Sequence, residues 1–298
     1  MRHCDLRRAR QTGFTLVEAV IVIMLTGIVA SIVSVFIVAP IKSYLSSTVR
    51  VNLADQTDTA LRRMLRDVRA AVPNSIRTPG PACFELVPTS TGGRARSGPD
   101  TVNDSAPSCA SGANCAAALD NTQATTAFDV LSTLSSTPAV GDFVVVGNQS
   151  PGDVYSGANR AAITGVSSAF PTFGRMRLNL ASTQFPLGYD GNRFSVVPAA
   201  QRAVFYACSG ADGTLDANGH GKGTLLRFMN YGFNAAYPTA CPSGGGDVLA
   251  TRVRSCTFVY DPNQGATQQN GFVWMQIELT RNNESATLAL GAHVSNAP

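Results

Sequence analysis

A single carboxylate, Glu18, lies near the start of a long apolar stretch, shortly after the dipeptide Gly13-Phe14. An ionised carboxylate inside a bilayer costs about 2.5–3.5 kcal/mol on insertion scales and usually has a partner. Cleavage after Gly13 would make Phe14 a new N-terminus with a cationic amine, and Glu18 would then lie close behind it. The spacing therefore predicts that the amine of one helix meets the carboxylate of a neighbouring helix, in the membrane or in the dry core of a filament.

The sequence contains no recognisable catalytic motif. Its three histidines, His3, His220 and His293, have no convincing nucleophile or metal-ligand spacing around them. No G-x-S-x-G or H-E-x-x-H motif occurs. Residues 219–224 approach a phosphate-binding loop, but Gly223 stands where serine or threonine should follow the lysine, so this segment is interpreted as a flexible loop. The sequence predicts no enzyme and no cofactor.

A weak calcium candidate lies in a glycine-rich turn. Asp212, Asp216 and Asn218 offer oxygen ligands at close spacing, and calcium binds hard oxygens of this kind. The same residue types are also what an ordinary turn uses, and that interpretation is favoured. Trp274 lies in an alternating apolar pattern, which predicts a core position for its side chain.

A basic segment precedes the apolar stretch. Its positive residues are Arg2, Arg7, Arg8 and Arg10, opposed only by Asp5. Residues 19–39 carry no charge and meet the requirement of about 20 apolar residues for a membrane-spanning helix. Positive charge beside such a segment stays on the cytoplasmic side. The simplest alternative is an uncleaved signal anchor, but that reading gives Glu18 no partner.

The motif Gly13-Phe14-Thr15-Leu16-Val17-Glu18 resembles the signal of type IV prepilins and pseudopilins. This resemblance implies that prepilin peptidase cuts between Gly13 and Phe14 and N-methylates Phe14. It also implies that Glu18 neutralises the amine of an adjacent subunit, with Thr15, Leu16 and Val17 completing the signal. Residues 1–13 would then be a cleaved leader.

Scattered segments beyond the motif extend the resemblance. Residues 61–69, 72–75, 191–197 and 293–298 resemble the O-type minor pilins of the mannose-sensitive haemagglutinin (MSHA) pilus system. The long helix and the terminal hairpin are more loosely similar to J-type pseudopilins of type II secretion. The tip-most K-type pseudopilins commonly lack the glutamate, so Glu18 points to a neighbouring position in a tip complex.

Periodicity predicts one helix over residues 14–72, with a transmembrane half (14–39) and an amphipathic half (40–72). Pro40 removes a backbone hydrogen bond and is expected to kink the helix, because the helical pattern resumes after it. The run of arginines at 62, 63, 66 and 69 is interpreted as a solvated or subunit-facing surface rather than a polyanion-binding patch. Pro73 is expected to stop the helix.

The remainder, residues 73–298, is predicted to be a β-rich head with antiparallel sheets, so the fold class is α+β and type IV pilin-like. Residues 89–125 are predicted to form a long surface loop, and 147–159 are turn-rich. Whether the head has one lobe or two stays open. Residues 272–279 and 286–290 flank 281–284 and predict a hairpin. Other predicted strands are 83–87, 128–131, 142–146, 175–180, 193–197, 202–207, 224–229 and 252–260.

Seven cysteines are present, and one of them, Cys4, lies in the leader. An even set beyond the membrane segment favours disulfides in an oxidising compartment such as the periplasm. Zinc is disfavoured because no C-x-x-C occurs. Cys109–Cys115 is the easiest local pair, but the sequence does not choose among pairings. The candidate disulfide cysteines are Cys83, Cys109, Cys115, Cys208, Cys241 and Cys256.

Two function classes follow. The first is a structural subunit of a pilus or pseudopilus, held in the inner membrane with its N-terminus cytoplasmic and its head periplasmic. Its expected partners are other minor and major pilins, prepilin peptidase, the inner-membrane assembly platform and the lipid bilayer. The second is a membrane-tethered periplasmic adhesin or enzyme, for which no clustered polar site or sugar-binding motif is found. The formal net charge of +4 owes much to the leader arginines, so charge gives no argument for nucleic acid.

Overall fold

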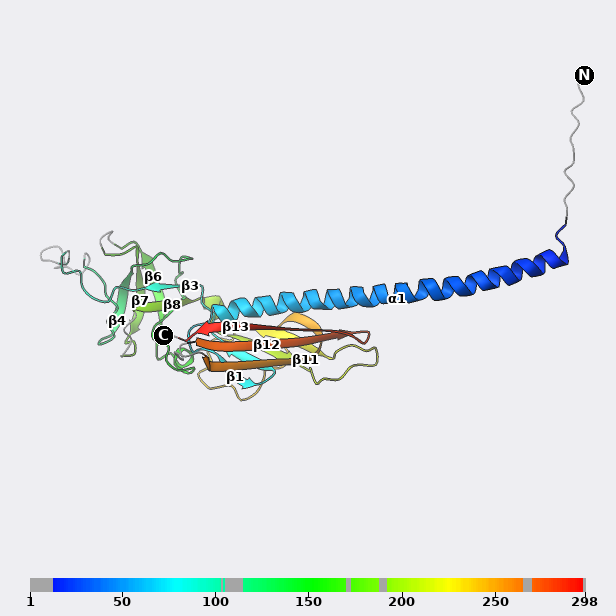
Figure 1. Ribbon diagram of the computed structural model, residues 1–298. Coiled ribbons are helices and arrows are strands. Elements are labelled where there is room, and N and C mark those ends of the chain that lie inside the picture. Colours follow the sequence, from blue (N-terminus) through cyan, green and yellow to red (C-terminus); the bar gives the residue numbers. More distant parts are fainter. Residues whose placement is uncertain are drawn as a thin grey trace, which may run out of the picture. The chain divides into compact units, whose positions relative to one another are not determined.

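A computed structural model describes residues 13–102, 104, 115–169, 173–187, 192–264 and 270–296. The fold is α+β, with a long N-terminal helix followed by a β-rich head of two antiparallel sheets (Figure 1). The chain forms two compact units that divide after Arg50. The second unit contains the C-terminal part of the helix and both sheets.

The helix α1 runs over Leu16–Arg69 and continues through Pro40, as the resumed periodicity predicted. A kink at Pro40 remains a prediction. The helix ends at Arg69 rather than at Val72, so the predicted end was wrong by three residues. The physical reason is a competing pairing with residues 87–89: Thr89 donates its N–H to Ala70 O (2.8 Å), and Val72 donates its N–H to Val87 O (2.8 Å).

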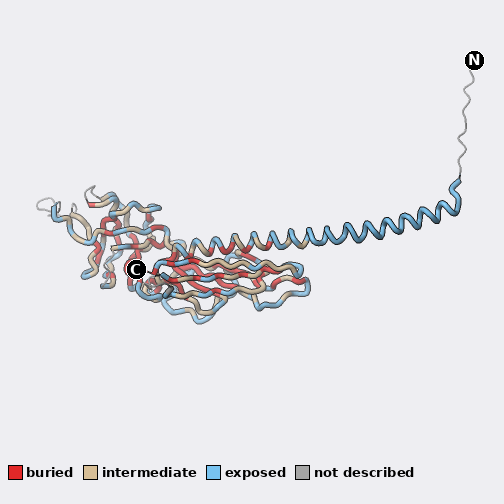
Figure 2. Tube along the Cα trace, viewed as in Figure 1, coloured by how far each residue is buried: buried red, intermediate tan, exposed pale blue. Residues whose placement is uncertain are grey.

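The C-terminal part of α1 has one buried stripe. Leu53, Thr57, Leu61, Met64 and Val68 are buried and recur every three or four residues, which places them on one helix face. The arginines of this segment, at positions 62, 63, 66 and 69, are all exposed. Figure 2 shows the first buried positions of the helix only in this C-terminal part.

A seven-stranded sheet has the order β1-β2-β9-β10-β11-β12-β13, with every neighbouring pair antiparallel. Its centre is buried, where the ring of Phe84 lies 5.3 Å from Tyr206 and 5.2 Å from Phe258. The strands are β1 (Arg77–Gly80), β2 (Cys83–Leu86), β9 (Val204–Ser209), β10 (Gly223–Phe228), β11 (Asp247–Gln264), β12 (Asn270–Arg281) and β13 (Glu284–Ser295).

The terminal hairpin is confirmed. Strands β12 and β13 pair from Asn270↔Ser295 to Arg281↔Glu284. Asn282 and Asn283 form the turn with φ of 53° and 63°, the left-handed conformation that a two-residue type I′ turn requires and that asparagine tolerates.

The core position predicted for Trp274 was wrong. Trp274 alternates with the buried residues Val273 and Met275 but belongs to the opposite face of β12, and it is 40% exposed. Its cross-strand neighbour Val259 is 52% exposed. Alternation alone predicts a strand with two unlike faces, but it does not tell which of the two apolar faces is covered.

A second sheet has six strands in the order β3-β8-β5-β6-β7-β4. Its core includes Phe128, Val144, Ile163, Leu178 and Phe194, with the rings of Phe128 and Phe194 5.0 Å apart. The head therefore contains two sheets, and both lie in the second compact unit. The strands are β3 (Thr91–Arg94), β4 (Thr125–Val130), β5 (Phe143–Val145), β6 (Arg160–Ser167), β7 (Met176–Thr183) and β8 (Arg193–Val197).

Five short elements of the head were not predicted from the sequence. Strand β3 lies inside the predicted 89–125 loop. Because Gly92 and Gly93 have no side chains, the alternation of apolar and polar residues that marks a strand is absent there. Strands β1 and β6 were missed, because each contains few large apolar residues. The short helices α2 (Asp153–Ser156) and η1 (Ala199–Gln201) were also not predicted; α2 lies in the turn-rich 147–159 segment.

Two disulfides are described in the head. Cys83 of β2 bonds to Cys241 in the loop after β10, with their Cα atoms 5.7 Å apart. Cys208 of β9 bonds to Cys256 of β11, with a Cα separation of 6.5 Å. Cys115 is also disulfide-bonded, and Cys109 lies outside the described residues. Bridges between segments far apart in sequence restrict the unfolded chain and thereby stabilise the fold.

A buried ion pair between β1 and β2 makes hydrogen bonds to the loop after β10, the loop that contains Cys241. Arg77 and Glu85 are each 1% exposed, and Arg77 Nη1 lies 3.7 Å from Glu85 Oε2. Arg77 donates to the carbonyls of Asn234 (2.9 Å) and Ala236 (3.0 Å), and Tyr231 donates its hydroxyl to Glu85 Oε1 (2.7 Å). Burial raises the pKa of Glu85. These contacts tie the loop after β10 to the edge of the seven-stranded sheet.

Candidate functional site

The Gly13–Phe14 peptide bond lies just before the first residue of α1. Gly13, Phe14 and Thr15 are non-helical, and Phe14 is 76% exposed. Among the described residues, no atom other than those of Gly13 and its chain neighbours lies within 4 Å of the place where a Cβ on Gly13 would stand. A protease needs an accessible peptide outside a helix, and this bond meets both conditions.

The residues after the bond begin the helix. The Thr15 hydroxyl accepts a hydrogen bond from the backbone N–H of Glu18 (3.2 Å), and the Thr15 carbonyl accepts from Ala19 (3.1 Å). Thr15 is therefore the N-cap, and Thr-x-x-Glu is the spacing of a capping box. A carboxylate in the first turn also interacts favourably with the positive end of the helix dipole. The signal residues thus have a local structural role in addition to any recognition by an enzyme.

The Glu18 side chain is exposed. Within the part of the chain that the structure describes, no cationic group forms an ion pair with it. The residues that follow it are apolar for several turns. This arrangement offers a fixed negative charge to a partner outside the described chain, and a cationic amine on a neighbouring helix would satisfy it.

The apolar part of α1 is not the core helix of the head. Its most apolar window has a mean hydropathy of 2.8 and none of it is buried. Among the described residues, α1 is the one helix long and apolar enough to span a membrane. The uniform exposure and the length fit a single-pass anchor.

The last turns of α1 contain a site that the sequence analysis missed. Asp67 accepts hydrogen bonds from the hydroxyl of Tyr206 (2.5 Å) and from Arg227 Nη2 (3.0 Å). Arg227 is 1% exposed and also bonds to Tyr206 through Nε (3.1 Å). Burial and the Asp67 carboxylate raise the pKa of Tyr206, so its hydroxyl stays protonated and donates. These bonds fasten α1 to strands β9 and β10.

The calcium candidates are engaged in their own turns. Asp212 Oδ1 accepts from the backbone N–H of Thr214 (2.9 Å). Asp216 Oδ1 accepts from the N–H groups of Asn218 and His220 (2.8 Å each). No group of three or more His, Cys, Asp or Glu side chains able to hold a metal ion is found among the described residues. The hydrogen bonds support the turn interpretation for Asp212, Asp216 and Asn218.

Residues 219–224, which approach the pattern of a phosphate-binding loop, lead into strand β10. Leu215 and Gly221 form an isolated antiparallel bridge, and Gly223 and Thr224 begin β10. His220 Nδ1 accepts a hydrogen bond from Asn282 N (3.1 Å) in the terminal hairpin. Residues 219–222 thus lie outside the named strands, as a loop would, and the flexibility of this segment remains a prediction.

Residues 8–34 match a protein-family model described as the prokaryotic N-terminal methylation motif. The matched segment contains the Gly13–Phe14 bond, the Thr15 cap, Glu18 and part of the apolar helix. The match supports a relation to type IV pilins and pseudopilins. No curated protein and no solved structure matches the chain.

Proposed function

We propose that this chain is a minor subunit of a type IV pilus or of a related pseudopilus, matured by removal and methylation of its N-terminus. The observation that carries the proposal is the methylation motif over residues 8–34 at the start of an exposed apolar helix. The β-rich head after a long helix agrees with a pilin-like fold.

The proposed maturation uses the N-terminal residues in sequence. Residues 1–13 stay in the cytoplasm, because their arginines remain on that side of the inner membrane. Prepilin peptidase cuts between Gly13 and Phe14 and methylates the new amine of Phe14. Removing the leader charges lets the helix leave the bilayer, and Glu18 pairs with the amine of an adjacent subunit in the assembled filament.

The proposed position is a low-copy place at or near the tip. The head has two sheets of seven and six strands, and a head of this size suits a subunit that caps a filament more than one that repeats along its shaft. The disulfides agree with a periplasmic location of the head. Within the family we propose the O-type minor pilin role of an MSHA-type system. There are two alternatives. The first is a J-type pseudopilin role in type II secretion, and the second is a membrane-anchored periplasmic adhesin. The proposed role is structural, with no catalysis.

Co-purification tests the proposed function. A tagged chain is produced in a cell that assembles type IV pili, and the assembly complex is cross-linked and isolated through the other pilins. We expect the wild-type chain to co-purify at the size of the shortened protein. A Gly13→Val variant should keep its leader and stay out of the complex, because a branched side chain crowds the bond to be cut. Equal recovery of both chains in the complex would refute the proposal.

A further inference from the structure

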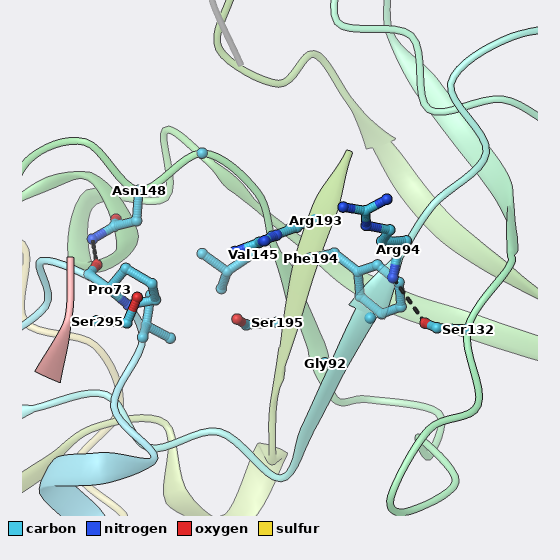
Figure 3. A pocket seen from close by; sticks show the side chains of 13 residues that line it. Pro73, Gly92, Arg94, Ser132, Val145, Asn148, Arg193, Phe194, Ser195 and Ser295 are labelled. Carbon is cyan, nitrogen blue, oxygen red and sulfur yellow. Dashed lines mark hydrogen bonds between the residues drawn. The ribbon is translucent and has the colours of Figure 1, made fainter. Parts of the chain in front are cut away.

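A cavity of about 450 Å³ opens on one face of the six-stranded sheet. It lies beside strands β3, β5 and β8, and Pro73 and Ser295 close its other side (Figure 3). The volume is within the range of about 300–1,000 Å³ that small-molecule sites occupy. None of the described residues that line it belongs to the N-terminal motif or to α1, which the proposed assembly role uses.

Strand register explains why this place is hollow. Gly92 pairs with Ser195, and Ser195 pairs with Val145, and cross-strand partners share a face of the sheet. This face therefore carries a glycine and a serine where larger side chains would fill the space. A Cβ on Gly92 would stand 2.8 Å from the carbonyl oxygen of Phe194, so the strand pairing itself keeps position 92 free of a side chain.

The two charged side chains among the described lining residues are both positive. Arg94 and Arg193 are direct cross-strand partners, and both line the cavity. Like charges at such positions repel each other, and neither guanidinium forms an ion pair with a described residue. No aspartate or glutamate is among the described residues that line the cavity. The arrangement leaves two adjacent cations that an anion would neutralise.

Hydroxyl groups surround the same space. Ser195 and Ser295 reach it from β8 and from the end of β13 (Figure 3), and no hydrogen bond joins either hydroxyl to another described residue. Ser132 also lines it and accepts a hydrogen bond from the N–H of Arg94 (2.9 Å). These groups are available to donate to, and accept from, a polar ligand.

One wall of the cavity is held in place before any ligand binds. Asn148 is 2% exposed. It donates to Pro73 O (2.6 Å) and accepts from Val154 N (3.0 Å) and Asn159 Nδ2 (2.8 Å). Val72 and Val145 pack in one apolar cluster behind it. A preformed wall lowers the entropy cost of binding.

We propose that this cavity binds a small ligand that carries both a carboxylate and several hydroxyl groups, the chemistry of a sugar acid. The paired guanidinium groups of Arg94 and Arg193 receive the carboxylate, since charge-assisted bonds from arginine to a carboxylate are strong. The hydroxyls of Ser195 and Ser295 bond to the hydroxyl groups of the ligand. This binding function goes beyond filament assembly and does not depend on it.

Calorimetric titration of the full-length protein in detergent with galacturonate tests the proposal, with galactose and acetate as separate titrants. We expect saturable binding of one galacturonate per chain, and binding of galactose and of acetate that is weaker by at least about tenfold, because each lacks one of the two recognised features. Arg94→Gln and Arg193→Gln should each weaken galacturonate binding by about fivefold or more.

Arg281→Gln is the matched control, because Arg281 lies at the hairpin end of β12 and does not line the cavity. It should bind galacturonate as the wild type does. Ser195→Leu keeps both arginines, fills the hollow and should abolish binding. No binding of galacturonate at millimolar concentration would overturn the proposal. So would unchanged binding in both cavity arginine variants, or galactose or acetate binding as tightly as galacturonate.

Discussion

The Glu18→Ala variant is expected to lose its leader normally and yet to fall out of the assembly complex, with its recovery reduced by at least about tenfold. Cleavage should persist because the bond that caps the helix runs from the backbone N–H of Glu18 to Thr15, so the substitution does not remove it. Assembly should fail because the amine of a neighbouring subunit is left without its counter-charge. Breaking a buried ion pair in this way costs about 3–5 kcal/mol, and about 1.4 kcal/mol already corresponds to a tenfold change in binding.

Thr26→Ala is the matched control for Glu18→Ala. Thr26 is another polar residue of the apolar helix, but its hydroxyl bonds only within the helix, to Val22 O (2.7 Å) and Ile23 O (3.0 Å). It should co-purify as the wild type does, and Glu18→Asp, which keeps the charge, should retain more binding than Glu18→Ala. Normal recovery of Glu18→Ala with the other pilins would contradict the proposed amine–carboxylate pairing.

The Asp67→Ala variant is expected to lower the free energy of unfolding of the head by about 3 kcal/mol or more, because the buried guanidinium of Arg227 loses its counter-charge. Tyr206 loses its acceptor at the same time. Urea unfolding of the full chain in detergent measures the effect through Trp274, the one tryptophan of the sequence, which lies on β12 of the sheet that receives these contacts.

Asp58→Ala gives the comparison within the same helix. Asp58 also pairs with an arginine, Arg62, but the Arg62 side chain is 69% exposed, and exposed pairs add little to stability. Its unfolding midpoint should stay close to that of the wild type. Adding Arg227→Met to Asp67→Ala should recover part of the lost stability, because the unpaired buried charge is gone. Equal midpoints for Asp58→Ala and Asp67→Ala would contradict the docking role of Asp67.

The features that the sequence predicted well are those with local signals. The helix through Pro40 follows from apolar residues repeating at helical spacing on both sides of the proline. The terminal hairpin follows from two alternating segments around Asn282-Asn283, because asparagine adopts the left-handed turn conformation. The N-terminal motif can be recognised in the sequence because its residues, from Gly13 to Glu18, are contiguous and need no tertiary contact; their roles in cleavage and assembly remain predictions.

The features that were missed depend on partners far away in the sequence. Asp67 was not predicted to form a site, because Tyr206 and Arg227 are separated from it by 139 and 160 positions. Strand β3 gains its structure from pairing with β8, while its own Gly92-Gly93 has no strand signal. The cavity with Arg94 and Arg193 has the same origin, since only the register of β3 and β8 brings these two arginines side by side.

Mass spectrometry of the N-terminal peptide, on protein purified from cells with an active prepilin peptidase, tests the central claim most directly. We predict a mature chain that begins at Phe14 and carries one methyl group on its α-amine. The same chain from cells without the peptidase should retain residues 1–13. An intact leader in the presence of the active peptidase, or a cut at any other bond, would contradict the proposed maturation.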